Sequence, residues 1–299
     1  MRSRVRAVWL AGAALVALIP STGAAAYASP APSRSAIARP LSWRVVPSPD
    51  RLADDELFGV TCLSARSCTA VGRGGGKTLV ERWNGTAWSI VPSPNPDTGQ
   101  DPDVLSSVSC VTAAFCAAVG EYGPADSAEP VTEIWNGHRW SLGPSQDRPS
   151  DPALYGVSCT SASACTAAGA YFDDAIDPPT EQTLIETGNS NGLSVVPSPN
   201  AGGAGTENVL TSVSCASRRA CIAVGNASAG NVTSGGALIE AWNGTRWSIV
   251  PSHITRKAAT VLDGVSCPSA TMCMATGARY TSSSQDSGQT LTELGTSSG

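Results

Sequence analysis

The sequence predicts an all-β protein, a five-bladed β-propeller of four-stranded antiparallel blades closed by an N-terminal strand. Three observations lead to this prediction. A unit of about 50 residues recurs five times. Each unit contains four short runs of strand-forming residues separated by turn residues. The fourth run missing from the last unit stands alone near the start of the chain. Repeated four-stranded units are typical of propellers, in which each sheet buries its faces against its neighbours.

Every cysteine belongs to a pair with five residues between its members. The first cysteines of successive pairs lie 48, 49, 56 and 52 residues apart, so the pairs mark the repeat. Opposed residues of an antiparallel hairpin are close enough for a disulfide, and we expect five local bonds between the first and second strands. They join Cys62 to Cys68, Cys110 to Cys116, Cys159 to Cys165, Cys215 to Cys221 and Cys267 to Cys273.

The first run of each unit reads L-x-[GS]-V-[ST]-C, and A-x-G follows the second cysteine. The third run ends in glutamate, and in three units W-N-G-x-x-W comes next. Asn-Gly predicts a tight hairpin, here a type I′ turn with positive φ at both central residues. The third unit has Gly188 and Leu193 in place of the tryptophans, and we expect looser packing at its outer edge.

The two ends of the repeat region complement each other. Leu41–Pro49 reads as a fourth strand with no strands before it, and the fifth unit ends after Glu293 without a fourth strand. We therefore expect residues 41–47 to pair with the strand that contains Leu291–Glu293 and to close the ring.

Residues 1–28 are predicted to be a secretory signal, with a basic start, an apolar core and Ala26-Tyr27-Ala28 as the cleavage site. Residues 29–40 are predicted to be a disordered, proline- and serine-rich lead-in. One propeller domain is expected over 41–299, with repeats near 50–97, 98–146, 147–200, 201–252 and 253–299. No membrane insertion is expected, because no apolar run has the length that a spanning helix needs.

Ten cysteines in an exported chain indicate disulfides and a secreted, extracellular location. Removal of Arg2, Arg4 and Arg6 takes the formal net charge from −5 to −8, which argues against nucleic acid as a partner. No cofactor or metal is expected. The cysteine spacing is not that of a zinc finger, and His138 and His253 are the two histidines of the sequence. We expect a monomer.

The W-N-G and V-P-S-P repeats resemble those of secreted propeller-like repeat proteins of actinobacteria. This resemblance covers 41–294. Gly-x-x-Trp at the third turn is similar to the Asp-box of sialidase-type propellers, although tryptophan replaces the aspartate. Kelch propellers have a similar repeat length. These resemblances imply the architecture, and none of them brings a defined activity.

A glutamate ends the third run of all five units: Glu81, Glu133, Glu186, Glu240 and Glu293. A ring of carboxylates could bind a cation or supply an acid and a base. Catalytic pairs, however, need two different environments to separate their pKa values. A residue that recurs at the same position of every repeat is expected to have the same role in every blade. We therefore favour a hydrogen-bonded structural role for these glutamates.

Candidate ligand residues come from loops of variable length, because the C-x5-C and W-N-G turns at the opposite end are uniform. Aromatic rings beside a carboxylate suit sugars, and the candidates are Tyr122, Tyr171, Phe172, Asp173 and Tyr280. Solvated connectors are the alternative interpretation of these loops. The predicted function is a secreted, non-catalytic binding module for carbohydrate or for an extracellular protein.

The alternative function is a glycoside hydrolase, sialidase-like or other, with a carboxylate pair in the central funnel. Its candidates are Asp173, Asp174, Glu121 and Asp263. Such an enzyme needs two non-repeat carboxylates about 5–10 Å apart.

Overall fold

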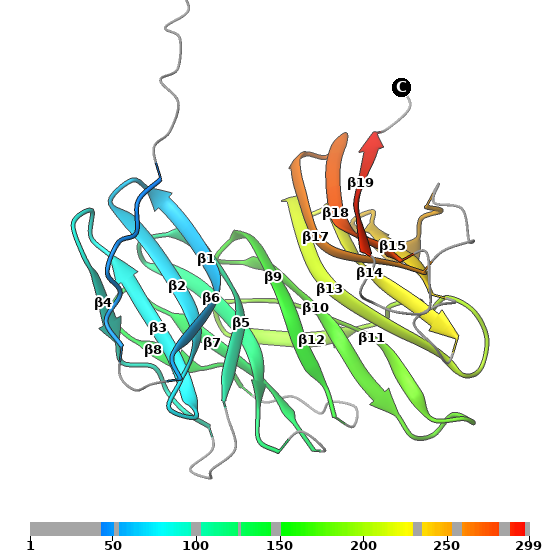
Figure 1. Cartoon of the computed structure of the whole chain (residues 1–299), viewed down its shortest axis with the longest axis horizontal. Coiled ribbons are helices and arrows are strands. Elements are labelled where there is room, and N and C mark those ends of the chain that lie inside the picture. The colour runs from blue at the N-terminus through cyan, green and yellow to red at the C-terminus, as the bar shows by residue number, and fades with distance from the viewer. Residues whose placement is uncertain are drawn as a thin grey trace, which may run out of the picture. The chain divides into compact units, whose positions relative to one another are not determined.

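The computed structural model describes residues 43–50, 54–96, 103–124, 127–144, 151–229, 235–252, 259–280 and 288–296. Within these ranges every regular element is a β-strand (Figure 1). One unit of the chain spans Met1–Val45, of which 43–45 are described, and the other, Val46–Gly299, contains all the strands. The predicted signal and lead-in lie outside the described residues.

The described strands form five antiparallel sheets that follow the repeats, and we call them blades 1 to 5. Blades 1 to 4 have four strands each, hydrogen-bonded in chain order, and blade 5 has three. Blade 1 contains β1(Glu56–Ser64), β2(Ser67–Gly74), β3(Lys77–Trp83) and β4(Trp88–Val91). Blade 2 contains β5(Val104–Thr112), β6(Phe115–Tyr122), β7(Glu129–Trp135) and β8(Trp140–Leu142). Blade 3 contains β9(Ala153–Ser161), β10(Ala164–Asp173), β11(Thr180–Asn189) and β12(Gly192–Val196). Blade 4 contains β13(Thr206–Ser217), β14(Ala220–Ala229), β15(Gly236–Trp242) and β16(Trp247–Ile249), and blade 5 contains β17(Ala259–Ser269), β18(Met272–Tyr280) and β19(Gly288–Thr296).

The cysteine pairs close the first hairpin of each blade, as predicted. Cys62 is directly opposite Cys68 in the β1–β2 register, and the same register recurs in blades 2, 3 and 4. All five disulfides are formed within their own C-x5-C segments, with Cα atoms 4.0–4.1 Å apart. The spacing therefore identified both the hairpin and its covalent bond.

The W-N-G segments form the second hairpin, but not as the predicted type I′ turn. Gly85 has a φ of 99°, whereas Asn84 is not among the described residues with positive φ. The loop instead spans four residues. The Asn84 side chain accepts hydrogen bonds from the backbone N–H groups of Thr86 at 2.9 Å and Ala87 at 3.0 Å. An Asx-type turn thus replaces the two-residue turn, because the asparagine side chain supplies the acceptor.

Successive blades pack face to face, and each pair of neighbours shares an apolar cluster that we call a junction. At the junction of blades 1 and 2, Val71 and Val80 of blade 1 pack against Leu105 and Val108 of blade 2. The leucine and valine of the L-x-[GS]-V motif thus face the preceding blade. The same arrangement recurs at the next two junctions. Stacking of amphipathic sheets around shared clusters is the organisation of propeller blades.

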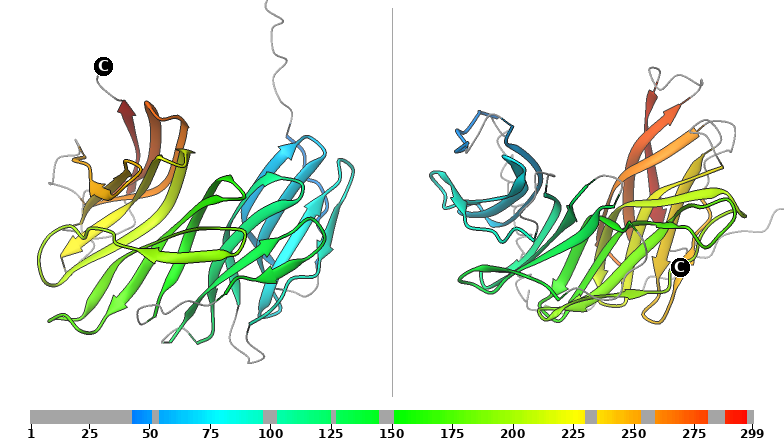
Figure 2. Two further views of the ribbon diagram at one scale, coloured as in Figure 1. Left: turned by 180° about the vertical axis from the view of Figure 1, so that it is seen from behind. Right: turned by 90° about the horizontal axis from the view of Figure 1, so that it is seen from below.

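The first strands of adjacent blades lie side by side, as the two views of β5, β9 and β13 show (Figures 1 and 2). Ser107 Oγ accepts a hydrogen bond from Val157 N at 3.2 Å, and Ser109 Oγ accepts one from Cys159 N at 3.0 Å. A Cβ placed on Gly156 would lie 3.0 Å from the Cα of Ser212. This close approach of two backbones explains the glycine at position 156, which faces a serine of the adjacent blade.

The outer edge of blade 3 is well packed, contrary to expectation. Leu193 is 1% exposed and belongs to the cluster shared by blades 2 and 3, together with Phe115 of blade 2. At the junction of blades 2 and 3, Phe115 fills space that tryptophan side chains fill at the neighbouring junctions. Because Phe115 belongs to blade 2, the sequence of repeat 3 alone does not reveal this compensation.

The predicted closure by residues 41–47 is not present. Leu41 lies outside the described residues, residues 43–50 contain no strand, and blade 5 ends at β19. Trp43 and Val45 are 93% and 94% exposed. In the other unit, Ser48 donates a hydrogen bond to Glu81 on β3, so this part of the segment is bound to blade 1 rather than to β19.

Candidate functional site

The repeated glutamates connect one blade to the exit of the preceding repeat. Ser93 Oγ donates to Glu133 Oε2 at 2.6 Å, and Ser198 Oγ donates to Glu240 Oε2 at 2.7 Å. Each serine belongs to a V-P-S-P exit, and each glutamate lies in the third strand of the next blade. Equivalent bonds join Ser48 to Glu81 and Ser252 to Glu293. A hydrogen-bonded structural role is confirmed at these four positions.

Burial controls the charge of these glutamates. It raises the pKa of Glu133 to about 7 and that of Glu240 to about 7, against the lowering effect of their serine partners. Oε1 of each side chain is buried without a hydrogen-bond partner, which penalises the ionised form. Burial therefore favours the protonated carboxyl group although the serine bond favours the carboxylate, and this balance is the same in two blades rather than specific to one site.

The predicted ligand residues do not form one group in the described structure. Tyr122 lies at the end of β6 and packs on the cluster between blades 1 and 2. Tyr171 lies in β10 and packs on the cluster between blades 2 and 3. Phe172 is 38% exposed, and Asp173 Oδ1 accepts a hydrogen bond from Ala175 N in the β10–β11 loop. Tyr280 ends β18 in blade 5.

A different tyrosine lies among carboxylates. Tyr155 is on β9, and the carboxylates of Glu121 on β6 and Glu181 on β11 both act electrostatically on its hydroxyl. Glu207 on β13 acts in turn on Glu181. We call these four residues the Tyr155 cluster. They come from blades 2, 3 and 4, so the cluster depends on the stacking of three sheets.

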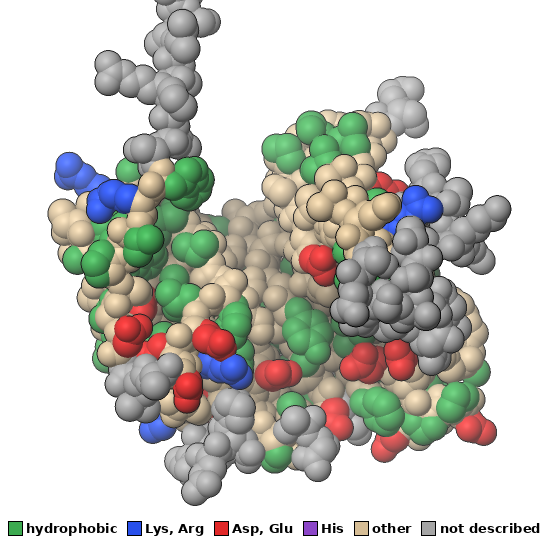
Figure 3. All heavy atoms as spheres, in the orientation of Figure 1, with side chains coloured by type: hydrophobic (Ala, Val, Ile, Leu, Met, Phe, Trp, Pro, Cys, Tyr) green, Lys and Arg blue, Asp and Glu red, His purple; other side chains and the backbone are tan. Residues whose placement is uncertain are grey.

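Burial raises the pKa of three members of the Tyr155 cluster, and like charge adds to this effect at two of them. Burial, reinforced by Glu121 and Glu181, raises the pKa of Tyr155 to about 12. Burial also raises the pKa of Glu121, and burial together with the charge of Glu207 raises that of Glu181. In the described ranges, the one ion pair joins Arg73 to Glu56 at 2.7 Å in blade 1, so no described cation forms an ion pair with Glu121, Glu181 or Glu207. On the face drawn in Figure 3, acidic side chains are more common than basic ones.

The four carboxylate candidates of the glycoside hydrolase alternative are dispersed over the chain. Glu121 belongs to the Tyr155 cluster, whereas Asp173 and Asp174 lie at the β10–β11 turn and Asp263 lies on β17 of blade 5. No group of three or more metal-binding side chains occurs among the described residues. A helix long and apolar enough to cross a membrane is likewise absent from the part of the chain that the structure describes.

The sequence did contain a signal for Tyr155. It occupies the variable position of L-x-[GS]-V, where the five repeats have Phe58, Ser106, Tyr155, Thr211 and Asp263. A variable position inside an otherwise uniform strand is a candidate for an individual role, just as a variable loop is. Glu181 and Glu207 lie at strand starts and carried no signal of their own.

A hollow lies between blades 4 and 5. Its volume is about 560 Å³, and its wall includes Ile222, Ile239, Trp242 and Leu294. The lining is mainly apolar, and the hollow is separate in sequence from the Tyr155 cluster.

No family model matches the chain, and no curated protein matches it. Among solved structures, the one titled "YCF48 bound to D1 peptide" is similar over 80% of this chain and 66% of that chain, with 11% identity and a TM-score of 0.44. "Structure of U3-55K" is similar over 74% of this chain and 61% of that chain, with 9% identity and a TM-score of 0.45. A structure titled "Glycoside hydrolase" covers 82% of this chain and 86% of that chain, with 9% identity and a TM-score of 0.36. With TM-scores below 0.5, none of these likenesses carries an argument about the activity of this chain.

Proposed function

We propose that this chain is an extracellular, non-catalytic binding module that holds its ligand at the Tyr155 cluster. The ligand is a carbohydrate or a segment of an extracellular protein. Five disulfides support an oxidising, extracellular location. The single observation that carries the proposal is the pair of partly desolvated carboxylates, Glu121 and Glu181, that act on the buried Tyr155, with no ion pair to either carboxylate among the described residues.

This arrangement selects a ligand rich in hydrogen-bond donors. A carboxylate that loses water gains from a charged or hydroxyl donor, and charge-assisted hydrogen bonds are the strong ones. Sugar hydroxyls supply such donors, and so do lysine and arginine side chains. The aromatic ring of Tyr155 adds a flat surface on which a sugar or an aliphatic stem can lie.

Binding fits the protonation of the cluster better than catalysis. A tyrosine nucleophile needs a lowered pKa, whereas that of Tyr155 is raised to about 12. An acid and base pair needs carboxyl groups whose pKa values are pushed apart, and burial raises the pKa of both Glu121 and Glu181.

Glycoside hydrolysis remains the second candidate function because Glu181 and Glu207 are electrostatically coupled. Paired carboxylates are the usual equipment of such enzymes. Release of a chromogenic group from aryl glycosides by the wild type, abolished in Glu181→Gln, would favour this second function over binding.

Of the loop residues, we propose Phe172 and Asp173 as additional ligand contacts from blade 3, and Tyr280 as a contact from blade 5. Tyr122 and Tyr171 contribute mainly to packing, because each lies against an apolar cluster. Changing either one is therefore expected to affect stability as well as binding.

The test compares binding by the wild type, by Tyr155→Ala and by the double variant Glu121→Gln/Glu181→Gln. A glycan array and a pull-down with extracellular proteins provide the two ligand classes. Each variant is expected to weaken binding by about tenfold or more, the equivalent of about 1.4 kcal/mol. Asp54→Asn is the matched control, since Asp54 is an exposed carboxylate just before β1 of blade 1. Binding that is unchanged in both variants but lost in Thr86→Ala would place the ligand at the W-N-G turns and refute the proposal.

A further inference from the structure

The outer edge of blade 5 is incomplete. In blades 1 to 4 a fourth strand is hydrogen-bonded to the third, whereas the described sheet of blade 5 ends at β19. An exposed strand edge presents unpaired backbone N–H and C=O groups and accepts a further strand readily.

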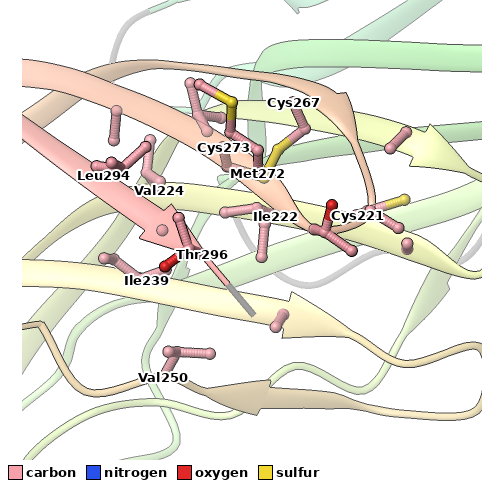
Figure 4. Close-up of a pocket in the computed structure, with 18 of the residues that line it drawn as sticks. Cys221, Ile222, Val224, Ile239, Val250, Cys267, Met272, Cys273, Leu294 and Thr296 are labelled. Carbon is pink, nitrogen blue, oxygen red and sulfur yellow. A yellow bond between two sulfur atoms is a disulfide. The ribbon is translucent and has the colours of Figure 1, made fainter. Parts of the chain in front are cut away.

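The missing strand leaves a hollow of about 560 Å³. Blades 2, 3 and 4 use a fourth-strand side chain to fill the junction with the preceding blade: Trp140 and Trp247 are each 5% exposed, and Leu193 is 1% exposed. At the junction of blades 4 and 5 the corresponding space is open (Figure 4). Leu294 contributes to its wall, and Gly295 stands where Trp135 and Trp242 stand in blades 2 and 4.

The chain carries a segment with the sequence of a fourth strand that is not paired in any described sheet. Trp43–Pro49 reads W-R-V-V-P-S-P, and the fourth strand of blade 1 with its exit reads W-S-I-V-P-S-P. The apolar side chains of Trp43 and Val45 are 93% and 94% exposed. Ser48 is bonded to Glu81 just as Ser93 is bonded to Glu133, where the serine leaves the fourth strand of the preceding blade. Glu81 of blade 1 thus binds the serine that, between the other blades, follows the fourth strand of the preceding blade.

The two end blades also have complementary uncovered faces. On blade 1, Leu57 and Val60 are 42% and 65% exposed, whereas Leu105 and Val108 at the same repeat positions in blade 2 are 0% and 7% exposed. On blade 5, Leu294 is 54% exposed, while its equivalent in blade 2, Ile134, is 5% exposed. Blades 2 to 4 bury the positions of Leu57 and Val60 in their junctions, and blade 2 buries that of Leu294. The two exposed faces therefore match in the same way as the faces of blades 2 and 3.

We propose that Trp43–Pro49 of a second copy of this chain completes blade 5, with Trp43 in the hollow between blades 4 and 5. The junction between copies then repeats the junction within a copy. Blade 1 of the second copy covers Leu294, and its own Leu57 and Val60 are buried in return. The occupant is a second copy rather than the same chain because Ser48 holds the exit of the segment on blade 1. Leu57 and Val60 of blade 1 and Leu294 of blade 5 are exposed, so these two blades do not share a junction among the described residues.

This contact is head-to-tail, with different surfaces on the two copies. Two or more copies can therefore close into a ring in which every blade 5 has a fourth strand. The inference is independent of the proposed function, because none of the residues of the Tyr155 cluster takes part in it.

The test begins with the molar mass of the chain from residue 29 to 299, measured by light scattering and native mass spectrometry over a range of concentrations. The expected mass is that of two or more chains. Trp43→Asp/Val45→Asp, which removes the donor, and Leu294→Asp, which alters the acceptor, should each give a monomer. All three residues are exposed, so the variants should fold. Arg44→Ser is the control that keeps the assembly, since serine is the residue of blade 1 at that position.

A mixing experiment identifies the geometry. The donor variant keeps an intact blade 5, and the acceptor variant keeps an intact Trp43–Pro49, so a mixture of the two monomers should form a one-to-one heterodimer. A wild type that is monomeric at all concentrations would overturn the proposal. If Trp43→Asp/Val45→Asp then lowered the thermal stability of that monomer, the segment would complete blade 5 of its own chain. A wild-type assembly that survives in the donor variant would also overturn it, since the copies would then meet elsewhere.

Discussion

Leu105 and Leu57 occupy the same position of the repeat, but the first is completely buried and the second is 42% exposed. The difference does not come from the leucine or from its strand, since both follow the same motif and form the same hairpin. It comes from the neighbour: blade 2 packs on blade 1, whereas the corresponding face of blade 1 is not covered by another blade. A junction therefore needs two blades. Blade 1 and blade 5 each have one apolar face that no described blade covers.

The largest expected effect separates the interior junctions from the end blades. Leu105→Ala should lower the free energy of unfolding by about 2–5 kcal/mol, because it removes a large side chain from a closed cluster. Leu57→Ala should cost less than about 1 kcal/mol, because solvent already reaches that side chain. Urea unfolding is measured with both substitutions placed in Trp43→Asp/Val45→Asp, so that assembly does not cover Leu57. Equal losses would show that blade 1 is covered in solution by something other than a second copy.

The second prediction concerns pH and the glutamates at the interior junctions. Burial raises the pKa of Glu133 and of Glu240 to about 7 in the folded chain, and both ionise near 4.5 when unfolded. The folded state therefore holds more protons between these values. The stabilisation is complete below about pH 4.5 and is lost as the pH rises through 7, by up to roughly 3 kcal/mol per glutamate.

The free energy of unfolding should accordingly decrease between pH 5 and pH 8, and the decrease should be much smaller in Glu133→Gln/Glu240→Gln. Gln keeps an acceptor for the serine hydroxyl but does not titrate. Glu129→Gln, at an exposed position of β7, is the control. A pH dependence that the double variant preserves in full would mean that other groups cause it.

The smallest expected effect is kinetic and compares the disulfides. Cys116, Cys165 and Cys221 are 2–4% exposed at interior junctions, whereas both cysteines of the blade 1 and blade 5 disulfides are partly exposed. Thiol exchange requires access to a sulfur atom. A mild reductant without denaturant should therefore reduce Cys62–Cys68 and Cys267–Cys273 several-fold faster than the other three. Alkylation followed by peptide mass spectrometry measures the order, and uniform reduction would show that the junctions do not shield the sulfur atoms.

Local patterns predicted the blade but not its surroundings. The Cys62–Cys68 spacing gave the first hairpin and its disulfide, because the two residues face each other across a short turn. The W-N-G segment gave the second hairpin with the wrong turn type, since the side chain of Asn84 accepts the hydrogen bonds that the prediction gave to the backbone. The role of the glutamates followed from their regularity, but their partners, such as Ser93 for Glu133, could be recognised only from the structure.

The candidate site was predicted less well. Loop variation pointed to Tyr122 and Tyr171, yet both rings pack on junction clusters. The tyrosine that lies among carboxylates, Tyr155, is inside a strand, and its partners Glu121 and Glu181 are brought to it by β6 and β11. A position whose residue differs between repeats is not needed for the common blade structure. Such variation does not distinguish a ligand contact from a side chain that packs against a neighbouring blade.

The sequence by itself determined the strands, the hairpins, the five disulfides and the faces that each blade buries, because these depend on residues close together in the chain and on an alternation of two. The tertiary structure alone decided which of those faces find a partner. Leu57 and Leu105 are indistinguishable in the repeat, and Trp43 has the same local pattern as Trp88. Their burial depends on whether another blade lies against them, and stacking depends on contacts between distant segments that a local pattern does not contain.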